Sequence, residues 1–452
     1  SRLLDGVSHL SRQHKCAPSV SVMQSSGGTI TAKQAGRQAV QLLLSGPAGG
    51  LAGAKFVAAT AGQQRLLSFD MGGTSTDVAL IDGEIVLTTE GHIGDYPVGV
   101  PMVDMHTIGA GGGSIASVDA GGLLQVGPQS AGADPGPACY GKGGSAATVT
   151  DANVVLGRLR PDLFLGGRLT LDSGAAHAAI ASLGQQLSLD VQTTAQGIIE
   201  VVKEHMARAL RVMSVQRGID PKKLTLVPFG GAGGLHVCAL AEALNMNNAI
   251  VPVYAGVLSA LGMLVAPKLR LMSRSVNLKC SDLNLDELQQ VFSELITTAT
   301  QALLEEGVSA QQLSVERSVD MRYLGQSYSL NLAWQTLELS QQNFHRLHQQ
   351  RYGHSLEQPV ELVTARVKVS AQAATLPLNP VGGDTTAASM LQTITLPGVD
   401  TAVNVYNREY MRAGDECCGP ALICETVSTT YVAPGWCCRV DPFGNLMLQK
   451  SS

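Results

Sequence analysis

A short turn rich in glycine and hydroxyl side chains, DMGGTSTD (Asp70–Asp77), lies between two apolar segments of the chain. The segments 66–70 and 77–81 have the composition of strands, and a third segment, 84–89, follows the turn Asp82-Gly83. Two adjacent glycines between apolar strands favour a tight reversal of the chain. The sequence therefore predicts a β-meander with the glycine-rich turn at one end of a sheet.

The residue types in this turn are typical of a phosphate-binding loop. Glycine lets backbone N–H groups approach an anion closely, and hydroxyl side chains add further donors, here Gly72, Gly73, Thr74, Ser75 and Thr76. Asp70 and Asp77 flank the turn, and a carboxylate repels a phosphate unless a cation lies between them. We therefore predict that Asp70 holds Mg²⁺ or its waters and is catalytic, and that Asp77 contributes to cofactor binding. The alternative is an ordinary hairpin capped by aspartate.

A second glycine-rich turn follows a buried strand later in the chain. A long amphipathic helix is predicted from Val191 to Arg217, with Gly218 as its C-terminal stop. A strand (224–229), the turn FGGAGG and a helix (235–244) come next. Strand, glycine turn and helix in this order direct backbone N–H groups at an anion or at an adenosine. We predict that this turn binds the cofactor through Gly230, Gly231, Gly233 and Gly234.

The segment VDMHTIGAGGGS places Asp104 and His106 two residues apart, so a strand would put both side chains on one face before a glycine loop. We predict that both residues are catalytic, as a metal site or a general acid/base pair, and that Gly111 and Gly112 bind the cofactor. The alternative is a histidine that orients the loop by hydrogen bonds, because one Asp and one His cannot complete a metal site. Asp134 and Cys139 are interpreted as a structural turn with a buried thiol.

Charge and hydrophobicity exclude several function classes. The formal net charge is -5 and no basic run is interleaved with aromatic residues, so we expect no nucleic-acid partner. No apolar stretch approaches the ~20 residues that span a bilayer, and the first ten residues do not resemble a signal peptide, so we expect no membrane partner and a cytoplasmic location. The nine cysteines show no CxxC spacing and are predicted to be reduced thiols. Since the chain does not begin with Met, we expect an internal start or a trimmed product.

The chain is predicted to hold three parts. Glycine clusters dominate residues 1–266, the first part. Residues 267–376 alternate helices (285–305 and 342–352) with strands around 319–323, 328–334 and 362–373, which indicates a second α/β unit. Residues 377–452 are interpreted as a Thr, Pro and Gly-rich linker (377–402) followed by short strands. A further helix is predicted from Thr150 or Asp151 to about Leu159.

The turn DMGGTSTD resembles the second phosphate loop of the superfamily of actin, sugar kinases and heat-shock-chaperone ATPases, and FGGAGG stands where that superfamily has its adenosine turn. Seven longer motifs resemble the hydantoinase A/5-oxoprolinase family: YPVGVPMVDMHTIGAGGGSIA, SAGADPGPACYG, TDANVVLGRL, PFGGAGGLH, MRYLGQSY, FHRLHQQRYGH and STTYVAPGW. The family includes the N-methylhydantoinase A subunit, 5-oxoprolinase and one subunit of acetone and acetophenone carboxylases.

This resemblance implies an α/β fold, with an actin-like ATPase (ribonuclease H-like) core, a second α/β unit and a small β-rich C-terminal region. It also implies ATP and Mg²⁺ as cofactors, a small cyclic amide as substrate, and a hydantoinase B-like subunit or domain as partner in an oligomer. The amide would be phosphorylated before ring opening. The alternatives are an ATP-dependent ketone carboxylase subunit and a non-catalytic nucleotide-binding assembly module.

In the family, another region with its own phosphate loop precedes this one, and no second copy of the loop stands before Asp70. We therefore expect the chain alone to be catalytically incomplete. The family motifs around Arg322, Gln326 and Tyr328, and around His348, Tyr352, Gly353 and His354, do not reveal their roles, and packing or subunit contact is an alternative to catalysis.

Overall fold

The computed structural model describes residues 20–89, 91–93, 96–372, 376–378, 380–382 and 390–451. The chain divides into two compact units, each built from separate segments. The larger unit contains residues 49–86, 104–263 and 376–452, and the smaller contains 1–48, 87–103 and 264–375. The start of the chain and, within the linker predicted at 377–402, residues 379 and 383–389 lie outside the described residues. The linker prediction was wrong at 390–394, because these residues form strand β19 (Met390–Ile394) by pairing with a strand that follows the predicted linker. The boundaries at 266 and 376 remain predictions.

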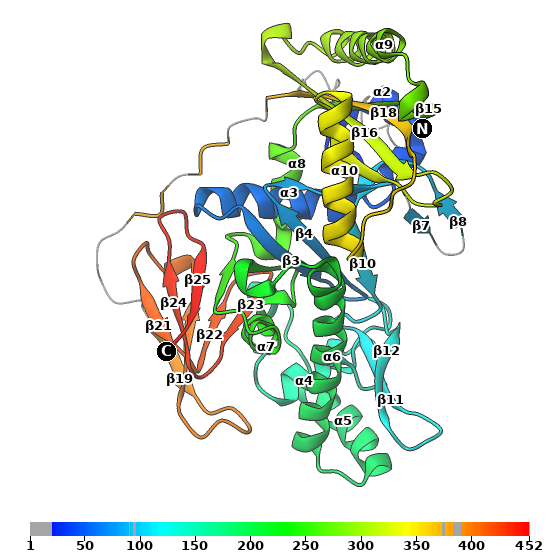
Figure 1. Cartoon of the computed structure of the whole chain (residues 1–452). Helices are drawn as coiled ribbons and strands as arrows, with labels where there is room; N and C mark the ends of the chain where they lie inside the picture. Colours follow the sequence, from blue (N-terminus) through cyan, green and yellow to red (C-terminus); the bar gives the residue numbers. More distant parts are fainter. Residues whose placement is uncertain are drawn as a thin grey trace. The chain divides into compact units, whose positions relative to one another are not determined.

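The larger unit is built on a mixed sheet, in which the structure describes nine strands (Figure 1). Five of them form its core in the order β10, β4, β3, β13, β14. Their bounds are β3 Arg65–Met71, β4 Thr76–Asp82, β10 Met105–Ile108, β13 Thr225–Phe229 and β14 Asn248–Val251. The first three in the chain form the antiparallel meander β3-β4-β10, while β13 and β14 run parallel to β3. If these five strands are counted by their position in the chain, from β3 as the first to β14 as the fifth, their order in the sheet is 3-2-1-4-5. This is the order of the ribonuclease H-like core that the resemblance implies. The predicted α/β fold is confirmed.

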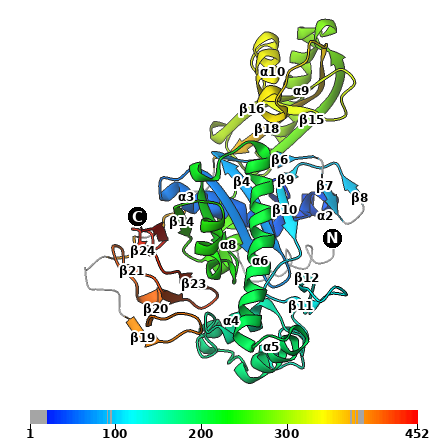
Figure 2. The ribbon, with the colours of Figure 1, turned by 60° about the horizontal axis from the view of Figure 1, so that its bottom comes forward.

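Helices pack around this sheet, and the longest is α6 (Val191–Met213), which runs beside β4 and β10 (Figure 2). Asp190 caps α6, because its Oδ1 accepts the backbone N–H of Thr193 at 2.9 Å. The stripe Ile198, Val202 and Met206 is fully buried. This unit also contains α4 (Val149–Val155), α5 (Ser173–Leu187) and α7 (Val237–Ala243), together with most of α3 (Ser45–Thr60) and of α8 (Leu258–Val265).

Helix α4 begins one turn away from the predicted cap. The sequence suggested Thr150 or Asp151, but Thr148 is the N-cap and Asp151, at helix position N3, completes a capping box with it. Asp151 is fully buried and accepts the N–H groups of Cys139 at 2.8 Å and Ala138 at 3.2 Å. The prediction was wrong because the Asp151 carboxylate binds both the first turn of α4 and the preceding turn at residues 138–139. The second of these contacts is tertiary.

Residues near the C-terminus extend the core sheet. Strands β25 (Leu446–Lys450), β24 (Trp436–Val440) and β21 (Glu416–Cys418) continue it beyond β14. A separate sheet of β19 (Met390–Ile394), β20 (Val403–Asn407), β22 (Ala421–Cys424) and β23 (Thr429–Val432) lies in the same unit. Two further strands, β11 (Ser114–Val118) and β12 (Leu124–Ser130), pair with each other.

The prediction that all cysteines are reduced was wrong, because Cys418 and Cys437 form a disulfide. The antiparallel register of β21 and β24 places Cys418 opposite Cys437 and Cys417 opposite Cys438. A bridge between two adjacent cysteines is geometrically poor, whereas the strand register brings a cysteine of one pair opposite a cysteine of the other. Cys16 lies outside the described residues, and the remaining cysteines are free and buried.

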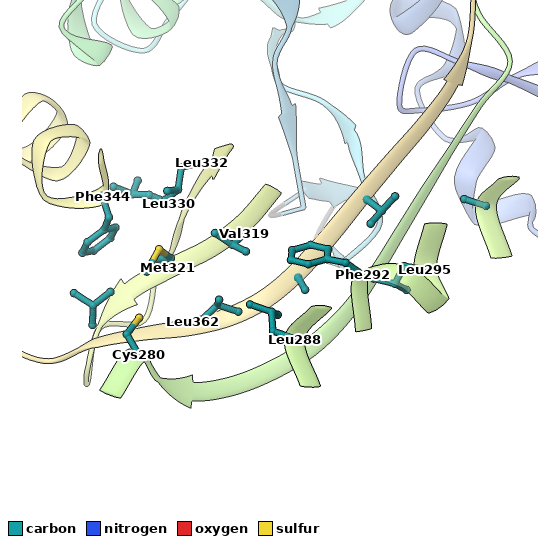
Figure 3. Close-up of a cluster of buried hydrophobic side chains, with 14 of the residues drawn as sticks. Cys280, Leu288, Phe292, Leu295, Val319, Met321, Leu330, Leu332, Phe344 and Leu362 are labelled. Atoms are coloured by element: carbon teal, nitrogen blue, oxygen red, sulfur yellow. The ribbon is translucent and has the colours of Figure 1, made fainter. Parts of the chain in front are cut away.

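The smaller unit contains a sheet in the order β15 (Leu269–Lys279), β18 (Val360–Ala371), β16 (Leu313–Tyr323) and β17 (Leu330–Ala333). Helices α9 (Leu285–Glu305) and α10 (Leu337–Tyr352) cover it, and α10 begins earlier than predicted because Thr336 is its N-cap. Figure 3 shows the apolar core between sheet and helices, with Phe292, Met321 and Phe344 fully buried. This unit also contains β1 (Ser21–Met23), β2 (Thr29–Thr31), α2 (Ala32–Arg37) and the short strands between residues 87 and 103.

Among the described residues, no helix combines the length and apolar character needed to cross a bilayer.

Candidate nucleotide site

The turn between β3 and β4 brings the two flanking carboxylates together. The antiparallel register pairs Asp70 with Asp77. The turn is closed by the N–H of Gly72, which donates to the carbonyl oxygen of Ser75 at 3.1 Å. Gly72, Gly73 and Thr74 are exposed. The turn therefore presents backbone to solvent directly beside two carboxylates.

Both carboxylates are perturbed by their surroundings. Burial, followed by the charge of Asp77, raises the pKa of Asp70 to about 6. Burial also raises the pKa of Asp77, while a hydrogen bond from Thr107 acts in the opposite direction. In that bond the Thr107 hydroxyl donates to Oδ1 of Asp77 at 2.6 Å. Two partly buried carboxylates that face each other are a favourable environment for a cation.

The glycine loop after β10 packs directly on the turn. The N–H of Gly112 donates to the carbonyl oxygen of Gly72 at 2.9 Å, and the N–H of Gly113 donates to that of Gly73 at 2.6 Å. A Cβ on Gly111 would lie 2.7 Å from the nitrogen of Ser75, so no side chain fits there. The N–H groups of Gly72 and Gly112 are thus engaged within the protein, and a phosphate would bind to other donors of the turn.

Gly230, the first residue of the second glycine turn, contacts the opposite side of Asp70. It has a φ of +78°, and a Cβ at this position would lie 2.3 Å from Oδ1 of Asp70 and 2.5 Å from the carbonyl oxygen of Met71. The N–H of Ala232 donates to that same carbonyl oxygen at 3.2 Å. The two predicted glycine turns, 160 residues apart in the chain (70 to 230), therefore meet at Asp70.

A cavity of about 210 Å³ opens beside these turns, within the larger unit. It is lined by Gly72, Gly73, Gly112, Tyr140, Thr150, Asn153, Leu159, Arg160, Leu163, Phe164, Leu165, Gly231, Ala232, Leu235, Glu425, Thr426, Val427, Ser428 and Thr429. One wall is polar backbone and another is formed by apolar side chains. The cavity thus combines exposed backbone groups of the glycine turns with an apolar surface.

Several lining segments were missed by the sequence analysis. The turn between β22 and β23, residues 425–428, forms one wall nearly 200 residues after Gly231 and carries no nucleotide-binding pattern. Its backbone packs on the second glycine turn, since a Cβ on Gly231 would lie 3.3 Å from the carbonyl oxygen of Val427, and the start of β23 does so too, since a Cβ on Gly234 would lie 2.6 Å from the carbonyl oxygen of Thr429. Gly233 and Gly234 are buried, and neither lines the cavity. They shape the turn that carries Gly231 and Ala232.

Asp104 and His106 do not line the cavity. Asp104 forms a two-bond ion pair with Arg217, at the end of the segment that follows α6. His106 is paired with Val78 in the β10-β4 register, whereas the next residue, Thr107, is paired with Asp77. Side chains alternate along a strand, so His106 faces away from the carboxylate pair and Thr107 faces it. The catalytic roles of Asp104 and His106 remain predictions.

The family motifs of the smaller unit form a closed hydrogen-bond network. Nδ1 of the buried His348 lies 2.7 Å from the carbonyl oxygen of His354, so Nδ1 carries the proton and Nε2 accepts from Nε2 of Gln326 at 3.2 Å. Gln326 also donates to the Tyr328 hydroxyl at 3.3 Å. Arg322 is paired with Glu361 at 2.7 Å. These contacts hold the end of α10 onto the strand β16 and its following turn.

Among the described residues, no group of three or more His, Cys, Asp or Glu side chains could hold a metal ion. The carboxylates Asp70 and Asp77 supply two hard oxygen donors beside an exposed phosphate-loop backbone. This set fits Mg²⁺, which commonly binds one or two carboxylates together with waters and substrate phosphates.

The core topology, with the two glycine turns at its end, is that of the actin-like ATPase class of fold. The sequence pattern of the hydantoinase/oxoprolinase family matches residues 1–270, and the chain belongs to this family. The family membership that the sequence motifs predicted is therefore confirmed.

The chain is similar to a caprolactamase and to an acetone carboxylase. Caprolactamase subunit alpha of Pseudomonas jessenii is 34% identical over 438 residues, which cover 93% of this chain and 63% of the relative. The crystal structure of the ATP-dependent caprolactamase from Pseudomonas jessenii superposes with a TM-score of 0.89 at 30% identity, covering 100% of this chain and 68% of the other. A nucleotide-free structure of acetone carboxylase gives a TM-score of 0.77 at 27% identity, covering 99% and 66%. The chain thus spans 63% of the length of the caprolactamase subunit.

Proposed function

We propose that this chain provides the nucleotide-binding part of an ATP-dependent hydrolase that opens cyclic amides, of the hydantoinase and 5-oxoprolinase type. One observation carries the proposal: the two glycine turns meet at Asp70 and share one cavity with an apolar wall. The similarity to an ATP-dependent caprolactamase supports the substrate class, because caprolactam is a cyclic amide.

In this proposal the nucleotide phosphates bind at the exposed turn, near Gly73 and Thr74. The base extends toward the apolar wall formed by Leu163, Phe164 and Leu235. Phe164 lies 5.9 Å from Tyr140, measured between ring centroids, so the wall includes an aromatic pair. Aromatic and aliphatic side chains provide a surface for the flat face of a purine.

Mg²⁺ would be held by Asp70, either directly or through its waters, with Asp77 beside it. The ion would neutralise charge on the phosphates as the phosphoryl group is transferred. In the protein alone, burial and the neighbouring carboxylate disfavour ionised Asp70, and a cation offsets both effects. Thr107 keeps Asp77 oriented by donating a hydrogen bond to it.

The chemical need for ATP follows from the stability of an amide. Resonance protects the carbonyl from attack by water, and transfer of the terminal phosphoryl group of ATP to the amide oxygen removes that protection. Water then adds to the carbon, the ring C–N bond breaks to free the amine, and a second water hydrolyses the resulting acyl phosphate to a carboxylate and phosphate. The contribution of this chain is to position the nucleotide and to neutralise its charge. We propose that a hydantoinase B-like subunit or domain completes the assembled enzyme.

The similarity to acetone carboxylase favours one alternative, a subunit in which ATP activates a ketone or bicarbonate. The two reactions differ in their requirements. Turnover of a cyclic amide without bicarbonate supports the hydrolase, whereas turnover that requires a ketone and bicarbonate supports the carboxylase.

Calorimetric titration of the full-length protein with Mg·ATP tests the proposal. We expect saturable binding, and hydrolysis once a cyclic amide and the partner are present. Absence of binding would overturn the nucleotide assignment. Binding without hydrolysis in the presence of the partner and substrate would instead favour a non-catalytic assembly module.

A further inference from the structure

Helix α4 contributes two side chains to the cavity lining, Thr150 and Asn153. They stand three residues apart, so both lie on the same face of the helix. Both also belong to the motif TDANVVLGRL, which contains no residue of the two glycine turns. This helix face therefore brings a third segment of the chain, with polar side chains of its own, to the cavity.

The start of α4 is fixed to the phosphate turn. The hydroxyl and the backbone N–H of Thr150 both donate to the carbonyl oxygen of Gly112 at 2.7 Å. The N–H of Gly112 in turn donates to the carbonyl oxygen of Gly72 at 2.9 Å. Asn153 lies one turn further along the helix, a rise of about 4.5 Å for three residues. Its place relative to the phosphate turn is therefore set by the fold.

The side-chain amide of Asn153 is buried and only half satisfied. The residue is 2% exposed, and its Nδ2 donates to the carbonyl oxygen of Val149 at 3.0 Å. A carbonyl oxygen can only accept, so this bond identifies which end of the amide is nitrogen. The other end, Oδ1, accepts no hydrogen bond from the residues that the structure describes. An unpaired buried acceptor is unfavourable for the folded protein.

The other polar side chains at the cavity have partners. Arg160 is paired with Asp162 at 2.9 Å, and Glu425 accepts a hydrogen bond from the hydroxyl of Ser428. Among the buried side-chain atoms that lack a partner in the described part of the chain, only Oδ1 of Asn153 belongs to a residue of the cavity lining. A bound molecule with an N–H or O–H donor would supply the missing hydrogen bond.

The surroundings of Asn153 indicate which donor of a nucleotide arrives there. The N–H of Leu159 donates to the main-chain carbonyl oxygen of Asn153 at 3.1 Å, which turns the chain back after α4 and leads it into the apolar wall with Leu163 and Phe164. The uncharged donors of a purine nucleotide are the ribose hydroxyls and the amino group of the base. Because an apolar wall suits the flat base, the amino group is the donor that we expect beside Asn153.

We propose that Asn153 makes the cavity selective for 6-aminopurine nucleotides, by accepting a hydrogen bond from the 6-amino group at Oδ1. This inference rests on the proposed nucleotide function. Since Oδ1 is covered by its neighbours, the amide turns about its Cβ–Cγ bond to meet the amine, and this torsion has a broad energy well in asparagine. A purine with a carbonyl oxygen at position 6 places an acceptor against an acceptor. A purine with hydrogen at this position leaves Oδ1 unpaired.

The test is a cycle between the amide and the amine. Calorimetry with the full-length protein compares the Mg²⁺ complexes of ATP, of purine riboside triphosphate, which has hydrogen in place of the amine, and of inosine triphosphate, which has oxygen. We expect wild type to bind purine riboside triphosphate about tenfold more weakly than ATP, and inosine triphosphate more weakly still. Leucine has the same branching at Cγ as asparagine but no acceptor. The Asn153→Leu variant should bind ATP about tenfold more weakly than wild type does, and as weakly as it binds purine riboside triphosphate.

Two controls isolate the contact. Asn343 lies on α10 in the smaller unit, so Asn343→Leu should leave all three affinities unchanged. With 2′-deoxy-ATP, which keeps the amine and lacks one ribose hydroxyl, Asn153→Leu should cause the same tenfold loss as with ATP. If Asn153→Leu does not fold, Asn153→Ala also removes the acceptor and is expected to show the same pattern of affinities.

Equal affinity of wild type for ATP and for purine riboside triphosphate would overturn the inference. A tenfold preference for ATP that persists in the variant would also overturn it, because another group would then recognise the amine. If the substitution weakens binding of ATP but not of 2′-deoxy-ATP, the donor is a ribose hydroxyl and the assignment to the base is wrong. Wild type that binds none of the nucleotides would refute the proposed function together with this inference, whereas binding of ATP without any coupling between amide and amine refutes the inference alone.

Discussion

Replacing Gly230 with alanine adds a single methyl group at the point where the two glycine turns meet. The new Cβ would lie 2.3 Å from Oδ1 of Asp70, and real contacts of this kind are not shorter than 3.0 Å. The carboxylate must therefore move by at least about 0.7 Å, the difference between these two distances. The Cβ would also lie 2.5 Å from the carbonyl oxygen of Met71, which is backbone and cannot rotate away.

Two costs follow from this geometry. The left-handed conformation of residue 230 costs an alanine about 1 kcal/mol, and overpacking against Met71 adds roughly 1–3 kcal/mol. Displacement of a positioned catalytic group by about 1 Å can lower a rate by about 100-fold. We therefore expect Gly230→Ala to lose roughly 2–4 kcal/mol of unfolding free energy and about 100-fold in Mg-dependent ATP hydrolysis.

Gly62→Ala is the matched control. Gly62 also has a positive φ, +73°, but an added Cβ there has no neighbour within 4 Å. It should lose only the conformational cost of about 1 kcal/mol, with hydrolysis unchanged. Urea unfolding and a phosphate-release assay of the assembled enzyme measure both effects. If Gly230→Ala behaves like Gly62→Ala in both assays, Asp70 is not positioned by this contact and our account of the site is wrong.

Three further predictions concern single residues. Asp70→Asn should abolish Mg-dependent ATP hydrolysis, while ATP should still bind in the absence of Mg²⁺. Calorimetry with and without the metal measures the binding. Full hydrolytic activity of the variant would remove Asp70 from the site. Burial and then Arg158 lower the pKa of His236 to about 3, so the unfolded chain takes up a proton near pH 6.5 that the folded protein does not. The unfolding free energy should therefore fall below pH 6.5 by about 1.4 kcal/mol per pH unit, or ~2 kcal/mol by pH 5. Urea titrations at pH 7 and pH 5 should show that the His236→Gln variant lacks this component. The same pH dependence in the variant and in wild type would contradict the assignment. The carboxylate of Asp151 accepts four hydrogen bonds, and in the Asp151→Asn variant an amide NH₂ would face some of these donors. The variant should therefore lose about 3 kcal/mol of unfolding free energy. A loss below about 1 kcal/mol in urea unfolding would show that the turn adapts.

Local sequence patterns predicted the parts of the site that depend on local geometry. The hairpin at Asp70–Asp77 and the strand-turn-helix at Gly230 follow from the composition of single contiguous segments, and the structure contains both. The predicted helix 285–305 matches α9 residue for residue because its apolar period and its cap, Asn284, lie within the segment. In these cases the information that specifies the structure is contiguous in the chain.

The features that could not be predicted depend on register or on distant packing. The disulfide requires the pairing of β21 with β24, and no spacing of cysteines indicates which strands pair. The cavity wall at 425–428 consists of ordinary turn residues, which line the cavity only because β22 and β23 pack beside the second glycine turn. The pairing of Asp104 with Arg217 likewise joins residues 113 positions apart.

The abundance of glycine at this site reflects contact between backbones more than flexibility. At Gly111, Gly113 and Gly230, an added Cβ would lie less than 3.0 Å from main-chain atoms of the phosphate turn or the strand before it. The segments at 111–113 and at 230 can approach residues 70–75 so closely only because glycine stands at their points of contact, and N–H and carbonyl groups of these segments bond to each other. Such an assembly is rigid, because each contact restricts the other two. The carboxylates of Asp70 and Asp77 are therefore held in place before any ligand arrives, which is what positioning and charge neutralisation at a phosphate require.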